Sequence, residues 1–198
     1  MPSLFRRSHD SSRTGLRMTP LQLAVWALLM GLSRHFTDAD ESYAERAGRL
    51  AVVAVAIVDA TGGDIGRAAR VVALGQAESN FARYVTEGRC QDGPVGSRCD
   101  PNRHGEPQSL GPWQQRRCSC PRAWDAPMGS VEQLRASARC ADRILREAHR
   151  RCQRRVADPE AGAFGGYRGV DCAWQGGVRR AEMSRRYRAR LQRLLASR

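Results

Sequence analysis

Apolar residues recur at helical spacing along most of this chain, and no segment shows sustained alternation with β-branched residues. The clearest helix begins after Ser130, which can form a capping box with Gln133. One apolar stripe then continues along this helix through Val131, Leu134, Ala138, Ala141, Leu145 and Ala148. The pattern predicts a mainly α fold.

The same spacing predicts several other helices, and a loop region between two of them. We expect helices from Asp38 to the Gly62-Gly63 pair, over 64–81, from 130 onward, from Pro159 to near Gly165–Gly169 with Asp158 as N-cap, and over 178–195. Between Thr86 and Met128 the residues are largely Gly, Pro, Cys, Asp and Asn without a period, which is typical of a long loop. Any strand is expected as a short β-hairpin within 86–112.

The N-terminal part has a different composition from the rest. Residues 1–37 form a lead-in whose first half is polar, rich in Ser and Arg and predicted to be disordered. The stretch Leu21–Ser33 is apolar and shorter than the about 20 residues that span a bilayer. It fits two interpretations: a secretory signal core, or a buried first helix with Thr19 as N-cap and Pro20 at its first position. Residues 38–198 are then expected to form one domain.

All seven Cys follow the first two predicted helices of the domain. This density is common in exported proteins that hold disulfides. Cys90 with Cys99, and Cys152 with Cys172, are plausible bridges across one loop and one short helix. Because seven is odd, at least one thiol stays free or pairs with another chain. The spacing of Cys118–Cys120 is not the two-residue gap that zinc sites favour, so a metal site is not expected.

The charge of the chain is strongly positive. Its formal value is +13, and all 33 basic residues are Arg, distributed along the whole chain. Such a surface attracts polyanions, and nucleic acid, anionic membrane and acidic cell-wall polymer all qualify. Because the sequence contains no zinc-finger, RNA-recognition or basic-zipper pattern, no specific nucleic-acid partner is expected.

A carboxylate interrupts the apolar face of the helix predicted over 64–81. Glu78 shares that face with Val71, Leu74 and Phe81. A carboxyl group among apolar neighbours has a raised pKa and can hold a proton near neutral pH, as a general acid must. Alternatively, Glu78 reaches solvent at the end of the helix or pairs with one of the many Arg residues.

Four short blocks follow one another along the chain: AESNF at 77–81, SLGPWQ at 109–114, GGYRG at 165–169 and EMSRRY at 182–187. In this order they resemble the Glu-Ser-x-Phe, Gly-Leu-Met-Gln, Ala-Tyr-Asn-x-Gly and Glu-Thr-x-x-Tyr blocks of the lysozyme-like superfamily. That superfamily contains the soluble lytic transglycosylases and the goose-type lysozymes. The resemblance covers 40–198 apart from the Cys-rich insertions, and implies a lysozyme-like helical domain.

The resemblance also implies a set of site residues. Glu78 would be the general acid and base. The substrate-binding residues would be Ser79, Phe81, Trp113, Gln114, Tyr167 and Tyr187. Arg168 departs from the pattern, because it stands where the family has Asn. The aromatic residues of this set also fit a packing role, as does Trp174.

The implied reaction is cleavage of the β-1,4 bond between N-acetylmuramic acid and N-acetylglucosamine in peptidoglycan. In a lytic transglycosylase the 6-hydroxyl of the muramoyl sugar attacks, with Glu78 acting as base, and a 1,6-anhydro product forms. A hydrolase commonly needs a second carboxylate. Asp92, Asp100 and Asp125 lie in predicted loops near the presumed cleft, but none belongs to a recognisable motif, which favours transglycosylation.

We therefore expect a monomeric enzyme, exported or associated with a phage, that acts on peptidoglycan without a cofactor, a metal or a transmembrane span. The alternative is a non-catalytic, Arg-rich protein that binds cell wall or nucleic acid through the same helical scaffold.

Overall fold

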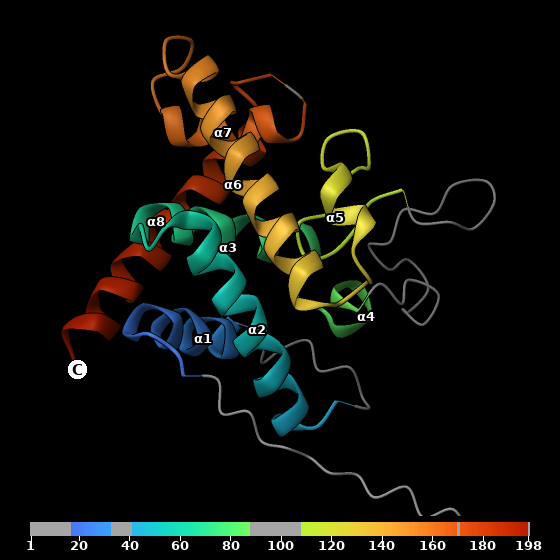
Figure 1. The fold of residues 1–198 in the computed structure, drawn as a ribbon. Coiled ribbons are helices and arrows are strands. Elements are labelled where there is room, and N and C mark those ends of the chain that lie inside the picture. Colours follow the sequence, from blue (N-terminus) through green and yellow to red (C-terminus); the bar gives the residue numbers. More distant parts are fainter. Residues whose placement is uncertain (1–16, 33–40, 88–107, 170, 198) are drawn as a thin grey trace, which may run out of the picture.

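The computed structural model of the protein describes residues 17–32, 41–87, 108–169 and 171–197. Eight helices form within these residues (Figure 1). They are α1 (Pro20–Leu32), α2 (Tyr43–Thr61), α3 (Ile65–Ser79), α4 (Arg83–Thr86), α5 (Pro121–Asp125), α6 (Val131–Cys152), α7 (Pro159–Tyr167) and α8 (Gln175–Ala196). The prediction of a mainly α fold is confirmed. The lead-in predicted to be disordered lies almost wholly outside the described residues.

The main helices begin and end at residues that cap them. Ser42 forms a capping box with Glu45 at the start of α2, and Gly62 ends that helix in the left-handed conformation, with φ 59°. The side chain of Asp64 accepts a hydrogen bond from the backbone N–H of Arg67 at the start of α3. These local signals set where α2 begins and ends and where α3 begins.

Three helix boundaries differ from the predicted ones. Helix α2 begins at Tyr43, after its N-cap Ser42, instead of at Asp38. Helix α3 ends at Ser79 instead of residue 81, because Asn80 and Phe81 both have φ 55°, and a left-handed backbone cannot continue a right-handed helix. Helix α8 begins at Gln175, one turn earlier than the predicted start at Val178. The left-handed pair after α3 turns the chain back sharply beside Glu78.

The region predicted as a long loop contains one short helix, α5, and another, α4, ends at the first residue of that region; the sequence pattern missed both helices. Where this region is described, it has an isolated β-bridge between Leu110 and Gln115 in place of a hairpin. The rest of the range predicted for a hairpin lies mostly outside the described residues. Helices this short carry too few apolar positions to show a period.

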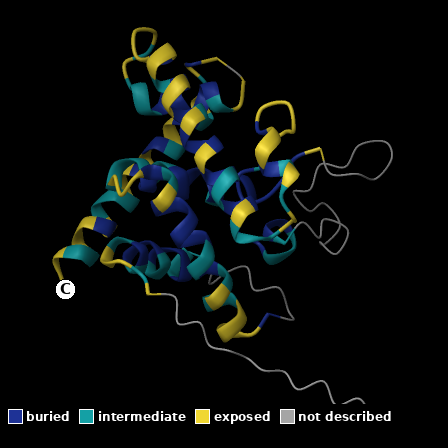
Figure 2. Cartoon of the chain, viewed as in Figure 1, coloured by how far each residue is buried: buried dark blue, intermediate teal, exposed yellow. Residues whose placement is uncertain are grey.

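Helix α3 lies near the middle of the molecule, in contact with α1, α2, α6 and α8 (Figure 1). Figure 2 shows that buried residues gather where these helices meet. Arg67 on α3 and Asp142 on α6 form an ion pair, with 2.6 Å between Nη2 and Oδ2, and the Asp142 side chain is 4% exposed. This pair joins the two helices whose side chains face each other across the site described below.

Helix α1 packs against α2 and α8. Val25, Leu28 and Leu29 are fully buried in the core. The indole of Trp26 donates to the carbonyl oxygen of Ala47 on α2, at 2.9 Å. The apolar N-terminal segment is therefore part of the packed core in this structure. In the described part of the chain, no helix is both long and apolar enough to cross a membrane.

Two disulfides are present among the described residues. Cys152–Cys172 ties the end of α6 to the segment before α8, so the pairing suggested by the sequence is confirmed. Cys120–Cys140, which the sequence did not indicate, ties the start of α5 to α6. The Cys118 thiol is free and exposed. The suggested bridge between residues 90 and 99 lies outside the described residues, and no group of metal-binding side chains occurs within them.

Candidate active site

Glu78 occupies the last turn of α3, and its backbone surroundings are tightly packed. A Cβ atom at Gly75 would lie 2.5 Å from the ring of Phe81 and 3.1 Å from the indole nitrogen of Trp113. Glycine permits this approach, because a side chain there would collide with the Phe81 ring and crowd the Trp113 indole. Phe81 folds back under α3 as a result, and the end of the helix is held against the core.

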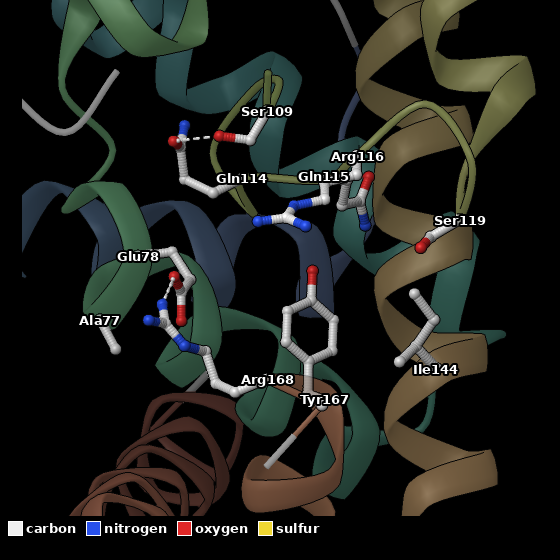
Figure 3. Close-up of a pocket in the computed structure, with 11 residues that line it drawn as sticks. Ala77, Glu78, Ser109, Gln114, Gln115, Arg116, Ser119, Ile144, Tyr167 and Arg168 are labelled. Atoms are coloured by element: carbon white, nitrogen blue, oxygen red, sulfur yellow. Dashed lines mark hydrogen bonds and ion pairs between the residues drawn. The ribbon is translucent and has the colours of Figure 1, made fainter. Parts of the chain in front are cut away.

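A cavity of about 610 Å³ opens beside Glu78, between α3, the segment 109–119, α6 and α7 (Figure 3). Its lining is mostly polar. It is formed by Ala77, Glu78, Ser109, Gln114, Gln115, Arg116, Ser119, Ile144, Tyr167, Arg168 and Gly169. Glu78 lies on one side and Ile144 of α6 on the other, with Tyr167 between them (Figure 3). Among these described residues Glu78 is the single carboxylate.

Two arginines hold the Glu78 carboxylate. Nη1 of Arg168 donates to Oε2 at 2.8 Å, and Nη2 of Arg180 lies 2.9 Å from Oε1 (Figure 3 shows the Arg168 contact). The Glu78 side chain is 6% exposed, that of Arg180 12% and that of Arg168 49%. Glu78 is thus buried, as the pattern predicted, and it pairs with Arg residues, which is the alternative that the sequence left open. Arg180 is fixed in the protein, whereas Arg168 extends to solvent.

Tyr167 forms part of the cavity wall, at the end of α7. Its hydroxyl donates to the carbonyl oxygen of Trp113 at 2.8 Å, which ties α7 to the segment that follows residue 108. Desolvation raises the pKa of the Tyr167 phenol above its ordinary range. The hydroxyl is therefore a hydrogen-bond donor at neutral pH, with its proton directed at the backbone.

Gln114 lines the cavity in a constrained conformation. Its backbone has φ 48°, and its side-chain oxygen accepts from the hydroxyl of Ser109 at 2.9 Å (Figure 3). Its side-chain nitrogen donates to the carbonyl of Gly111 at 3.1 Å. These contacts fix the Gln114 amide at the edge of the cavity. A ligand there could replace Ser109 as the hydrogen-bond partner of the amide.

Four of the predicted site residues do not line the cavity. Trp113 is fully buried, and its indole donates to the carbonyl of Val71 at 2.9 Å, so the expected sugar platform is a core anchor. Phe81 is 1% exposed and packs under α3. The hydroxyl of Ser79 donates to the Gly75 carbonyl at 3.1 Å and accepts from the Phe81 N–H, so it caps the helix.

Tyr187 is the fourth of these residues, and it lies on a different side of α3. Its hydroxyl donates to the side-chain oxygen of Gln76. Burial raises the pKa of its phenol. Tyr187 therefore fixes α8 to α3 and does not line the cavity that holds Glu78 and Tyr167.

Sequence reasoning missed Arg180, and it treated Arg168 only as a departure from the family pattern. Both lie far from Glu78 along the chain and are two among 33 basic residues, so no local signal marks them. Of the candidate second carboxylates, Asp125 is exposed at the end of α5 and does not line the cavity. Asp92 and Asp100 lie outside the described residues.

Comparison of the chain with protein-family models, with curated proteins and with solved structures found no match.

Proposed function

We propose that this chain cleaves the β-1,4 bond between N-acetylmuramic acid and N-acetylglucosamine in peptidoglycan, with Glu78 as general acid and base. The observation that carries the proposal is the position of Glu78, a buried carboxylate in the wall of a cavity of about 610 Å³. A carboxyl group withdrawn from water can transfer a proton to a glycosidic oxygen, which is a poor leaving group. The cavity volume lies in the range of roughly 300–1,000 Å³ that is usual for small-molecule sites.

Transglycosylation is the reaction that best suits a single carboxylate. Hydrolysis commonly uses a second Asp or Glu, either to activate water or to form a covalent intermediate. Among the described residues that line the cavity there is no carboxylate besides Glu78. Attack by a hydroxyl group of the substrate itself requires no second carboxylate.

A single residue, Glu78, can carry out both proton transfers of the proposed reaction. In the substrate complex Glu78 first takes up a proton from water in place of its contact with Arg168. It gives this proton to the bridging oxygen, the bond from that oxygen to C1 of the muramoyl sugar breaks, and an oxocarbenium-like centre develops at C1. The muramoyl 6-hydroxyl then bonds to C1 and returns its proton to the Glu78 carboxylate. The products are a 1,6-anhydro end and a free 4-hydroxyl, and no water is consumed.

The two arginines impose a condition on this chemistry. A proton can reach the substrate from Glu78 only if at least one guanidinium contact is exchanged for the glycan. Arg168 is the one to exchange, because its side chain is 49% exposed and that of Arg180 only 12%. We infer that Arg168 leaves Glu78 when the substrate enters.

The proposed setting of the enzyme is outside the cytoplasm, or within a phage. Disulfides persist in oxidising compartments, and the described residues hold two. The formal charge of +13 favours encounter with an anionic wall polymer. We propose that the chain acts there as a monomer without a cofactor.

The alternative is a non-catalytic, Arg-rich binding protein for cell wall or nucleic acid. One observation favours it: each oxygen of Glu78 already has a guanidinium neighbour, at 2.8 and 2.9 Å, which is also how a purely structural ion pair is built. Such a protein would shift DNA in a steeply salt-dependent manner, or bind cell walls, without clearing them.

Glu78→Gln tests the two functions against each other, because it keeps the shape of the side chain and removes the acid. We expect the wild-type chain to clear a peptidoglycan zymogram and Glu78→Gln to lose at least about 100-fold of this activity, in line with the usual contribution of general acid catalysis. The control is Glu160→Gln, which removes an ion-paired Glu, 12% exposed, that does not line the cavity.

Two results would reject the proposal: equal clearing by wild-type and Glu78→Gln, or no clearing by a folded wild-type chain. Mass spectrometry of the products then decides the reaction type, since a 1,6-anhydro end is lighter than a reducing end by one water.

A further inference from the structure

Helix α8 presents a row of arginines on one exposed face. Its members, which we call the α8 arginine face, are all exposed: Arg179, Arg186, Arg190 and Arg193. At about 100° per residue, these four positions lie within roughly 60° of one another around the helix axis. At about 1.5 Å per residue, the row is about 21 Å long. It follows α8 along one edge of the molecule to the C-terminal end (Figure 1).

The charges of this face are not neutralised within the described part of the chain. None of its four guanidinium groups forms an ion pair there, whereas the neighbouring Arg185 pairs with Asp158 at 3.0 Å. Glu182 is the one acidic residue of α8. Like charges four residues apart on a helix, such as Arg186 and Arg190, repel each other. An anionic ligand that lies along the face would remove this repulsion.

The exposed arginines of α6 are arranged differently. Arg143 pairs with Glu147 at 3.2 Å, and Arg146 pairs with Asp142 at 2.9 Å. Acidic residues of α6 itself therefore neutralise part of its charge. The α8 arginine face is the better candidate for binding an anion from outside the chain.

The length of the face favours a linear polyanion whose charges are about 7 Å apart. Four guanidinium groups along about 21 Å have a mean spacing of roughly 7 Å. A phosphodiester polymer with three-carbon linkers has six backbone bonds between successive phosphates. Six such bonds extend to about 7 Å, as the six backbone bonds of two amino-acid residues do. Guanidinium groups bind phosphate oxygens through paired, charge-assisted hydrogen bonds.

Nucleic acid and membrane fit this face less well. Proteins that bind single-stranded nucleic acid use aromatic side chains on which the bases stack. Beside this face, Tyr187 is half-buried and its hydroxyl donates to Gln76, and the ring of Trp174 already has the Arg180 guanidinium over it. A helix that binds a membrane surface inserts an apolar face. The apolar face of α8 is packed against α1, α3 and α7.

We propose that the α8 arginine face binds a linear polymer of polyol phosphates, which is a phosphodiester chain without bases. Such a polymer suits a cell envelope, and this choice rests on the proposed setting outside the cytoplasm, not on the proposed reaction. Arg179 also lines a cavity of about 370 Å³ that shares Ala77 with the cavity of Glu78. A polymer bound along α8 therefore extends to the neighbourhood of the candidate active site.

Binding of poly(glycerol phosphate) to the full chain tests the proposal, with fluorescence anisotropy of the end-labelled polymer as the measurement. The variant replaces all four members of the α8 arginine face by Gln. We expect at least about 30-fold weaker binding at low salt, because each exposed contact contributes a factor of roughly two to five. The slope of log Kd against log salt concentration should also become smaller by roughly 2 to 3.

The matched control replaces four exposed arginines outside α8 by Gln: Arg139, Arg150, Arg154 and Arg155. They too form no ion pair within the described residues, and the change in net charge is the same. We expect the control to weaken binding by less than about threefold, through the long-range field alone. If both fourfold variants lose equal affinity, the polymer responds only to net charge and the inference is wrong.

Thermal unfolding checks that both variants are folded, as expected for exposed positions that receive a good helix former. Should the α8 variant fail to fold, Arg186→Gln combined with Arg193→Gln replaces it. We expect this pair to weaken binding by at least about fivefold. Unchanged binding by a folded α8 variant would also reject the inference.

Single-stranded DNA with the same number of phosphates tests the other partner. We expect the wild-type chain to bind it more weakly than poly(glycerol phosphate). If the DNA binds more tightly and the α8 variant loses that binding, the face is a nucleic-acid surface and the inference is wrong.

The failure of this inference differs from the failure of the proposed function. A chain that binds the polymer through α8 but does not clear peptidoglycan has the binding face without the activity. A chain that clears peptidoglycan, but binds the polymer no better than its α8 variant does, has the activity without the binding face.

Discussion

At the scale of single residues, Arg168 is the more exposed of the two arginines that pair with Glu78. It lies at the solvent side of the ion pair and at the edge of the cavity, where an anionic substituent of a glycan can compete with Glu78 for its guanidinium. A substrate carboxylate that binds Arg168 would release Oε2 of Glu78 in the same step. The residue that departs from the family pattern would then select for charged glycans.

Arg168→Gln should reduce this selection. We expect the ratio of kcat/KM for carboxylate-bearing peptidoglycan strands to that for the neutral N-acetylglucosamine polymer to fall by roughly fivefold, because an exposed ion pair contributes up to about 1 kcal/mol. Arg139→Gln, an exposed position on α6, is the control and should keep the wild-type ratio. An unchanged ratio in Arg168→Gln would mean that Arg168 has no part in substrate choice.

Tyr167 makes the stability of the fold sensitive to alkaline pH. Because the pKa of its phenol is raised in the folded state, its contribution is complete below the unfolded pKa of about 10 and is lost as pH rises towards the folded pKa. Tyr167→Phe should cost about 1 kcal/mol at pH 8, where the hydrogen bond to the Trp113 carbonyl is lost.

The pH dependence of the free energy of unfolding tests whether Tyr167 is the residue responsible. Between about pH 10 and 12 the free energy of unfolding in urea should fall less for Tyr167→Phe than for the wild-type chain. Tyr43→Phe, at a side chain that is largely exposed on α2, should follow the wild-type curve. Parallel curves for Tyr167→Phe and wild type would contradict the assignment.

At the scale of elements, the Cys152–Cys172 disulfide encloses α7, the helix that carries Tyr167 and precedes Arg168. The two Cys are 20 residues apart in sequence, and closing a loop of this length stabilises a fold by about 3 kcal/mol in the chain-entropy model. The double variant Cys152→Ala and Cys172→Ala should therefore lose about that much free energy of unfolding.

Denaturant unfolding without reductant measures this loss. The free Cys118 provides the control, since Cys118→Ser removes an exposed thiol and should unfold like the wild-type chain. If the double variant were as stable as the wild type, α7 would be held by packing against α6 and α8 alone.

The elements that the sequence predicted are those whose signals are local. Ser42, Asp64 and Ser130 cap their helices through neighbouring residues, and the bridge from Cys152 to Cys172 flanks one short helix. Glu78 was found because it interrupts an apolar face. The arginines that hold it, and the pairing of residues 120 and 140, depend on contacts between distant segments, which no local pattern encodes.

Aromatic residues illustrate the same limit within the site. A motif marks a position but does not say which way its side chain points. Trp113 and Phe81 enter the core because Gly75 leaves room for both rings beneath α3, and Tyr187 meets Gln76 on another side of that helix. Of the predicted substrate-binding residues, Gln114 and Tyr167 are the two that line the cavity with Glu78.

At the scale of the whole molecule, α1 determines how much of the chain the fold requires. Its buried side chains pack on α2 and α8, and both of these helices contact α3, which carries Glu78. Burial of a Val or Leu side chain contributes roughly 1.5–3 kcal/mol, and the net stability of a domain is only about 5–15 kcal/mol. Loss of Val25, Leu28 and Leu29 together would remove a large part of that margin.

Two N-terminal deletions distinguish the contribution of the lead-in to stability from that of α1. Deletion of residues 1–16 removes no described residue, and we expect it to leave the melting temperature and the zymogram activity unchanged. Deletion of residues 1–33 also removes α1 and opens the core over α2 and α8, so we expect it to abolish the cooperative thermal transition. If the longer deletion melted like the full chain, α1 would be dispensable for folding, and its segment could be a removable signal. Loss of the thermal transition would mean that the folded protein retains α1.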